Sequence, residues 1–307
     1  MKPDSRSLIL HHYATSPFSE KIRKLLAHKR LAWFGVEQPN MMPKPDLVPL
    51  TGGYRKIPVL QIGADVYCDS QLIARVVERH AGPTIYPDGS EATCHAWNLW
   101  ADRCLFLPVV AIVFADIGHL VPPAFIEDRS RMMGGRNFGD VPAQAPAARE
   151  QLRGLVATLD AQLADGRPFL LGATFSLADA ACFHSLWFLR VAPSAGPLLE
   201  PFAHVRAWFE RVDALGTGDS APLAPADAIA IAHAATPAAG TGVAAGEPND
   251  LAAGARVTVT ADDYGFDPVA GTVVSASASE IAIARRDERV GDLVVHFPRV
   301  GFRVARA

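Results

Sequence analysis

The chain has 307 residues, of which 50% are hydrophobic and 20% are charged, and its formal net charge is −3 at pH 7. This composition is typical of a folded protein of two or three domains and excludes a disordered chain. The longest apolar run, Cys104 to Phe114, contains Pro108 and is too short to span a bilayer, and the N-terminus shows no secretory signal, so we expect a cytoplasmic protein without a membrane partner.

The placement of charges and cysteines narrows the possible ligands. Every lysine lies at or before Lys56, so the N-terminal part is modestly cationic and suits a small anionic ligand. The sequence has no run of Arg and Lys interleaved with aromatic residues, so it does not predict a nucleic-acid partner. The four cysteines, Cys68, Cys94, Cys104 and Cys182, have neither CxxC nor metal-type spacing, so we expect free thiols and no metal site.

A strand, a short turn and a helix open the chain. The apolar run from Leu8 to His12 predicts the strand, and apolar residues at helical spacing predict the helix from Pro17 to Arg30. Pro17 favours the first helical turn, which makes Ser16 the N-cap. Because backbone N–H groups at a helix start stabilise negative charge, a thiolate held against the Ser16 hydroxyl would have a lowered pKa. The alternative is that Ser16 only caps the helix.

The next elements complete a βαβ unit followed by a ββα unit. Residues 32–37 predict a second strand, and Lys56 to Ile62 predict a third. Pro58 belongs at the start or edge of that strand, because proline cannot donate to a sheet ladder. A tight turn leads to a strand at residues 66–68, and Asp69-Ser70 caps a helix that ends near Gly82.

Three motifs in this order resemble a known family. Ser-Pro-Phe-Ser at residues 16–19, Lys-Ile-Pro-Val-Leu at 56–60 and Asp-Ser at 69–70 are similar to the N-terminal domain of cytosolic glutathione transferases. The nearest classes are the serine-type ones, including the tau and zeta classes. The resemblance implies an α/β thioredoxin-like fold for residues 1–83 and glutathione as co-substrate.

The resemblance also implies roles for individual residues. Ser16 matches the serine that donates a hydrogen bond to the glutathione sulfur, and Ile57, before the family's cis Pro58, matches the residue whose backbone pairs with the cysteinyl part. Lys56 matches a lysine near the glycyl carboxylate. The γ-glutamyl group is received by the pair matching Asp69 and Ser70, although the family more often has Glu at the first position. Tyr13 is the alternative catalytic residue, because it lies where the tyrosine-type classes place their phenol.

The second segment, residues 90–235, is predicted to be an all-helical domain. Ala148 to Leu163 shows an amphipathic repeat, and Ser176 and Asp179 form a capping box before an apolar helix. The element around this box resembles the Gly-x-x-x-Ser/Thr-x-x-Asp motif that opens the central helix of the second domain in glutathione transferases. With it the resemblance extends to about residue 215.

The last segment departs from the family. Residues 236–250 are predicted to be a linker, and residues 251–307 contain five short strands separated by turns, which predict a small all-β barrel-like domain. Ordinary members end before this domain. The resemblance therefore assigns this domain no role, and three roles stay open: binding a partner, covering the cleft, or extending a dimer interface.

Two classes of function follow from the sequence. The first, which the resemblance implies, is a homodimeric glutathione transferase for detoxification, in which the activated thiolate attacks a small electrophile. Conjugation, isomerisation and dehalogenation share that thiolate and are not distinguished. The second is a non-catalytic binding or stress-regulatory protein that keeps the fold and recruits partners through its β domain.

Overall fold

A four-stranded mixed sheet forms the N-terminal part of the molecule, which we analyse as a computed structural model describing residues 2–306. Strand β1 is parallel to β2 and antiparallel to β3, which is in turn antiparallel to β4. The strands are β1 (Ile9–His12), β2 (Trp33–Glu37), β3 (Val59–Ile62) and β4 (Asp65–Cys68), and the helices are α1 (Pro17–His28), α2 (Val48–Thr51) and α3 (Ser70–Glu78). This arrangement confirms the predicted thioredoxin-like domain, with α1 and α3 packed against each other.

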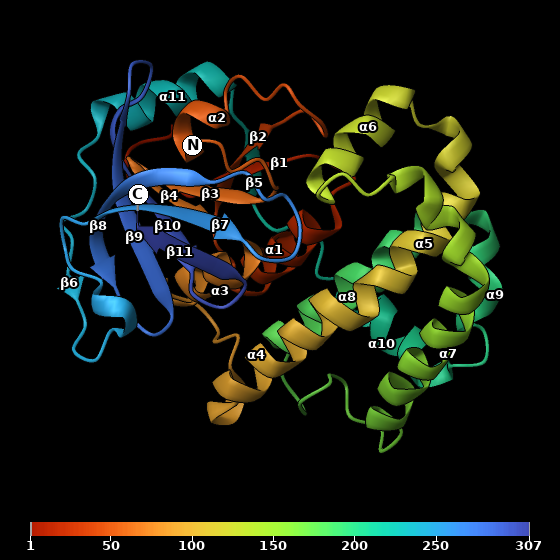
Figure 1. Ribbon diagram of the computed structural model, residues 1–307. Helices are drawn as coiled ribbons and strands as arrows, with labels where there is room; N and C mark the ends of the chain where they lie inside the picture. Colours follow the sequence, from red (N-terminus) through yellow and green to blue (C-terminus); the bar gives the residue numbers. More distant parts are fainter. Residues whose placement is uncertain (1, 307) are drawn as a thin grey trace.

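The helical part lies beside this sheet, on the right in Figure 1. Its central helix α8 (Leu177–Phe188) is buried along most of its length and packs against α1 and α4. The other helices are α4 (Glu91–Trp100), α5 (Phe106–Ile117), α6 (Pro123–Met132), α7 (Ala145–Gln162), α9 (Gly196–Leu199) and α10 (Ala203–Asp213), with 3-10 turns at Pro87–Gly89, Gly118–Leu120, Phe138–Gln144, Leu189–Val191 and Pro193–Ala195. A π-helical segment, Ala101–Leu105, joins α4 to α5.

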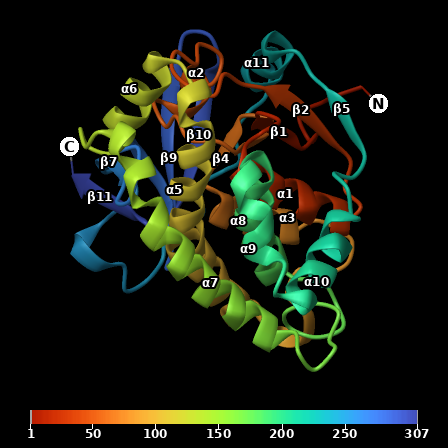
Figure 2. The ribbon, with the colours of Figure 1, turned by 90° about the vertical axis from the view of Figure 1, so that its right-hand side faces the viewer.

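The run from Glu91 to Leu120 is long and apolar enough, by length and composition only, to cross a membrane. The same test is passed by core helices of soluble proteins. Here α5 packs against α7 and α8, as Figure 2 shows for its long crossing with α7. Of the apolar window in this run 39% is buried, and the buried side chains of α5 belong to the helical core.

The predicted capping element is present at the start of α8. The buried Asp179 carboxylate accepts hydrogen bonds from the Ser176 backbone N–H (2.9 Å) and hydroxyl (2.7 Å). It also accepts one from the Leu170 N–H and one from Trp208 Nε1, both at 2.8 Å. One side chain therefore joins the α8 start to α10 and to the loop before α8.

The end of the predicted helical segment returns to the N-terminal sheet. Strand β5 (Ser220–Pro222) pairs in parallel with β2, and α11 (Pro225–Ala234) follows it. Ala228 of α11 shares a small core with Ile9 and Phe34. Residues 220–234 thus differ from the expectation that the helical domain runs to residue 235, because their apolar side chains cover the first two strands.

Five strands complete the chain and continue the same sheet (blue in Figure 1). They are β7 (Arg256–Ala261), β8 (Val269–Ala276), β9 (Glu280–Asp287), β10 (Gly291–Pro298) and β11 (Phe302–Arg306), which we call the C-terminal β unit. Their order is β11-β7-β8-β9-β10, and all these pairs are antiparallel. Strand β10 then pairs in parallel with β4, with Val295 opposite Val66. The strand-rich region is confirmed, and it is joined edge to edge to the thioredoxin-like sheet.

A shared core fastens the C-terminal β unit to the N-terminal domain. One buried cluster contains Leu47 and Val59 of the first domain together with Val257 and Phe297 of the last. The predicted linker is also held in place. Strand β6 (Gly242–Val243) pairs with β8, and a 3-10 turn covers Pro248–Asp250. At the start of the linker, the Ala238 N–H donates to Asp65 Oδ2 at 2.9 Å. The β unit is thus part of the body of the molecule.

Candidate functional site

Ser16 occupies the N-cap of α1, as the sequence predicts. Its backbone is extended, Pro17 is the first helical residue, and Ser16 Oγ accepts a hydrogen bond from the Ser19 N–H at 3.2 Å. The side chain is buried, with 1% of the residue exposed. The Ser16 hydroxyl also hydrogen-bonds the Tyr13 phenol, an interaction that lowers the pKa of that phenol. Ser16 and Tyr13 therefore lie together at a helix start, where the partial positive charge stabilises an anion.

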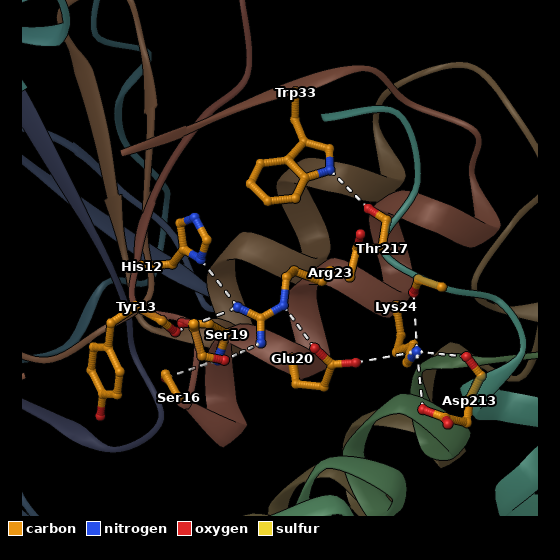
Figure 3. A network of polar contacts seen from close by, with 12 residues as sticks. His12, Tyr13, Ser16, Ser19, Glu20, Arg23, Lys24, Trp33, Asp213 and Thr217 are labelled. Carbon is orange, nitrogen blue, oxygen red and sulfur yellow. Dashed lines mark hydrogen bonds and ion pairs between the residues drawn. The ribbon is translucent and has the colours of Figure 1, made fainter. Parts of the chain in front are cut away.

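Charged side chains fix the turn that presents Ser16 (Figure 3). Arg23 donates to His12 Nδ1 at 3.1 Å, to the Ala14 carbonyl at 3.0 Å and to Glu20 Oε2 at 2.7 Å. Burial, and then the charge of Arg23, lowers the pKa of His12 to about 4, so the imidazole stays neutral and accepts. Lys24 joins the same helix to the carbonyls of Asp213 and Gly216, each at 3.0 Å. These hydrogen bonds fix both the backbone of the turn, at Ala14, and helix α1, which follows it.

The Ile57–Pro58 peptide bond is cis, as the family resemblance implies. Strand β3 begins only at Val59, and in the described part of the chain no hydrogen bond is recorded for the Ile57 backbone N–H or C=O. Backbone groups near a protein interior are nearly always paired. The unpaired amide of Ile57 is therefore suited to a peptide-like ligand.

Asp69 and Ser70 begin α3, also as predicted. Asp69 is the N-cap, with its carboxylate accepting from the Gln71 N–H at 2.9 Å, and its φ of 74° lies in the left-handed region that non-glycine residues seldom adopt. Such backbone strain tends to persist at ligand sites. Ser70 Oγ accepts from Lys21 Nζ at 2.9 Å, so its own proton is left to donate.

A buried group of polar residues lies behind Ser70 and was not predicted from the sequence. Lys21, fully buried, also donates to Asn98 Oδ1 at 3.0 Å and to both Asp102 oxygens at 2.7 and 2.8 Å. Two sequence signals were available for this group. One is a lysine on the buried face of the first helix, and the other is an Asn and an Asp four residues apart in an apolar helical run. The pairing joins residues 81 positions apart, which no local pattern indicates.

Lys56 is the first residue of the second motif, and its ammonium is occupied. Lys56 Nζ is 3.1 Å from Asp263 Oδ1, and it also lies 5.6 and 5.4 Å from the ring centroids of Tyr54 and Phe302. Asp263 belongs to the loop after β7. The role that the resemblance implies for Lys56 therefore competes with an ion pair from the C-terminal β unit.

Tyr13 belongs to a second, cationic group between the domains. Burial raises the pKa of the Tyr13 phenol, and the neighbouring Arg129 charge opposes that rise, so the phenol is protonated at neutral pH. Lys44, only 3% exposed, lies 6.0 Å from the Tyr13 ring centroid, and within residues 2–306 no hydrogen bond or ion pair is recorded for its ammonium. Burial, followed by the charges of Arg129 and Arg55, lowers the pKa of Lys44 to about 7. Lys44 is therefore a second candidate for binding an anion.

Two surface hollows lie elsewhere. One of about 540 Å³ is lined by Cys104, Leu107 and Leu155, and one of about 340 Å³ by Phe114, Ile126 and Phe138. None of the predicted site residues lines either hollow. Within residues 2–306, no three His, Cys, Asp or Glu side chains are grouped so as to hold a metal ion.

Known glutathione S-transferases resemble this chain in sequence and in fold. The profile described as glutathione S-transferase, N-terminal domain, matches residues 10–84, and that described as glutathione S-transferase, C-terminal domain, matches residues 142–211. A GST-like protein from Pseudomonas syringae is 39% identical, with a TM-score of 0.83, over 98% of this chain and 100% of that one. A search among curated proteins finds no match.

Two further solved structures match a smaller part of the chain. A glutathione S-transferase III in apo form is 26% identical, with a TM-score of 0.52, over 68% of this chain and 92% of that one. A tau-class glutathione S-transferase from mango, Mangifera indica, is 19% identical, with a TM-score of 0.54, over 69% and 90%. The chain belongs to the glutathione S-transferase family. The Pseudomonas match extends over nearly the whole chain, so it includes the C-terminal β unit.

Proposed function

We propose that this protein is a glutathione transferase-type enzyme in which Ser16 holds the glutathione sulfur as a thiolate for attack on a small electrophile. The hydroxyl proton of Ser16 and the N-terminal N–H groups of α1 would stabilise the negative sulfur and lower its pKa. The unpaired backbone of Ile57, beside Pro58, would bind the cysteinyl part. Asp69 and Ser70 would receive the γ-glutamyl group at the start of α3.

One observation carries this proposal: two serine hydroxyls lie at helix starts, and the oxygen of each already accepts a hydrogen bond from the protein. Ser16 Oγ accepts from the Ser19 N–H, and Ser70 Oγ accepts from Lys21. The Ser70 proton is left to donate to an incoming acceptor, and the Ser16 proton would turn from the Tyr13 phenol to the ligand. One acceptor would be the thiolate and the other the γ-glutamyl carboxylate, and each lies at the positive end of a helix dipole.

Ser16→Ala tests the catalytic role. Turnover of glutathione with a general aryl halide should fall roughly 100-fold, because the donor to the developing thiolate is lost. Ser19→Ala is the matched control: Ser19 is buried in the same helical turn, its hydroxyl has no hydrogen-bond partner within residues 2–306, and its backbone N–H still reaches Ser16. Circular dichroism and glutathione binding would verify that both variants are folded.

The outcomes separate the two classes of function and the two candidate donors. Full turnover in Ser16→Ala with loss in Tyr13→Phe would transfer the role to Tyr13. A parent that binds glutathione but turns over no electrophile would favour the non-catalytic binding protein. Homodimer formation, a cytoplasmic location and a role in detoxification belong to this proposal as expectations from the family.

A further inference from the structure

The loop between β7 and β8 crosses the candidate site. Residues 262–267, Asp-Asp-Tyr-Gly-Phe-Asp, follow β7 directly, and we call them the acidic strap. In Figure 1 this loop extends from the C-terminal β unit toward the helical part. The strap is therefore a contribution of the last segment of the chain to a site built by the first two.

Contacts hold the strap to both other parts of the molecule. Asp263 pairs with Lys56 of the thioredoxin-like domain at 3.1 Å. Asp262 pairs with Arg103, in the segment that joins α4 to α5, at 2.9 Å. The Gly265 N–H donates to the carbonyl of Met132, at the end of α6, at 2.8 Å. The strap thus closes over the boundary between the first two domains.

The strap also changes the charge that a ligand would meet. Arg103 lies 3.8 Å from Asp263 as well as beside Asp262, so two carboxylates face the two cations Lys56 and Arg103. A ligand carboxylate that approaches Lys56 has to displace Asp263 or lie next to it. The ligand carboxylate and the Asp263 carboxylate would then repel each other, and the repulsion is stronger where water is partly excluded. The Lys56 side chain is only 15% exposed.

We propose that the acidic strap is a specificity element of the thiol site, which disfavours a free carboxylate at the Lys56 end of the co-substrate and favours a neutral amide or ester end. The inference rests on the proposed function, because it takes glutathione as the parent ligand. The preferred co-substrate class is then a glutathione derivative capped at its glycine. Asp263 acts as a specificity residue by occupying Lys56, and Asp262 orients the strap through Arg103.

Calorimetry with two tripeptides tests this specificity in the full-length chain. Glutathione and its glycyl ethyl ester share the thiol and the γ-glutamyl group, and they differ at the glycyl end in one negative charge and one ethyl group. We expect the parent to bind the ester more tightly than the free acid. Asp263→Asn should tighten binding of the free acid about three- to tenfold and of the ester less than about twofold, in keeping with a partly exposed ion pair.

Asp267→Asn is the matched control within the strap. Asp267 is exposed, and among residues 2–306 no ion pair is recorded for it, so its neutralisation should leave both affinities unchanged. Asp263→Asn is nearly isosteric at a side chain that is 37% exposed, and its melting temperature should equal that of the parent within a few degrees.

Three results would overturn the proposal. Equal affinity for both tripeptides in all proteins would remove the specificity role and leave the proposed function intact. Discrimination that is lost only in Lys44→Met would place the carboxylate end at Lys44 instead. No binding of either tripeptide to the parent or to Asp263→Asn would overturn the proposed function together with this inference.

Discussion

At the scale of single residues, one histidine connects the first domain to the last strands. His296 of β10 lies 3.0 Å from Asp65 Oδ1 of β4 through Nε2, and 2.7 Å from Glu280 Oε1 of β9 through Nδ1. Its ring stacks on Tyr67 at 4.3 Å. Burial alone would lower the pKa of His296, but hydrogen bonds to the two carboxylates and their charges outweigh it and raise that pKa above its usual value. The imidazolium is thus favoured in the folded protein.

This shift predicts a pH dependence of stability. A histidine whose pKa is raised on folding contributes stability fully below its unfolded pKa, about 6.5, and loses it as the pH rises through the folded pKa. His296→Gln should lower the free energy of unfolding by about 2 kcal/mol at pH 6, and the difference from the parent should shrink toward pH 9. Urea unfolding at several pH values measures this. A pH-independent difference would contradict the role of the imidazolium.

Residue-scale sequence reasoning located the parts of the site that form locally. Ser16, Asp69 and Ser70 each lie at a helix start that their own neighbours specify, so cap chemistry predicts these helix starts, and the binding roles of the three residues stay predictions. The contacts of Lys21 and Asp263 were not predicted, because their partners Ser70 and Lys56 lie 49 and 207 positions away in the sequence. Burial decides their contacts, and burial depends on the packing of distant elements.

At the scale of elements, the start of α8 is the best-defined stabilising feature that the sequence predicted. Asp179 satisfies four donors, so its loss leaves buried N–H and O–H groups without a partner. Asp179→Ala should lower the free energy of unfolding by about 3 kcal/mol or more. An unchanged melting temperature by calorimetry would rule out this account of the element, and Asp165→Ala, at an exposed loop, provides the control.

Strand pairing is the element-scale feature that sequence patterns did not provide. The five C-terminal strands were predicted from alternation and turn residues, and all five are present. Their attachment was not predicted, because the parallel pairing of β10 with β4 joins segments about 230 positions apart and leaves no local signature. Strand β5 was not predicted either. It is only three residues long, and it pairs with β2, which is far away in the sequence.

At the scale of the whole molecule, the shared sheet predicts that the C-terminal β unit cannot be removed. Truncation after residue 235 would expose the β4 edge and the apolar side chains of Leu47, Val59 and Val66, which are fully buried in the intact chain. An exposed apolar strand edge promotes aggregation. The truncated chain should be insoluble on expression, whereas a soluble truncated protein that melts like the parent would show that the unit is an independent appendage.

The central claim is that Ser16 lowers the pKa of the bound glutathione thiol, and the ultraviolet absorbance of the thiolate, followed against pH in the binary complex, measures it most directly. The account predicts a bound-thiol pKa well below the free value of about 8.5 in the parent and in Ser19→Ala, and a return toward that value in Ser16→Ala. Equal, unshifted titrations in all three proteins would contradict it.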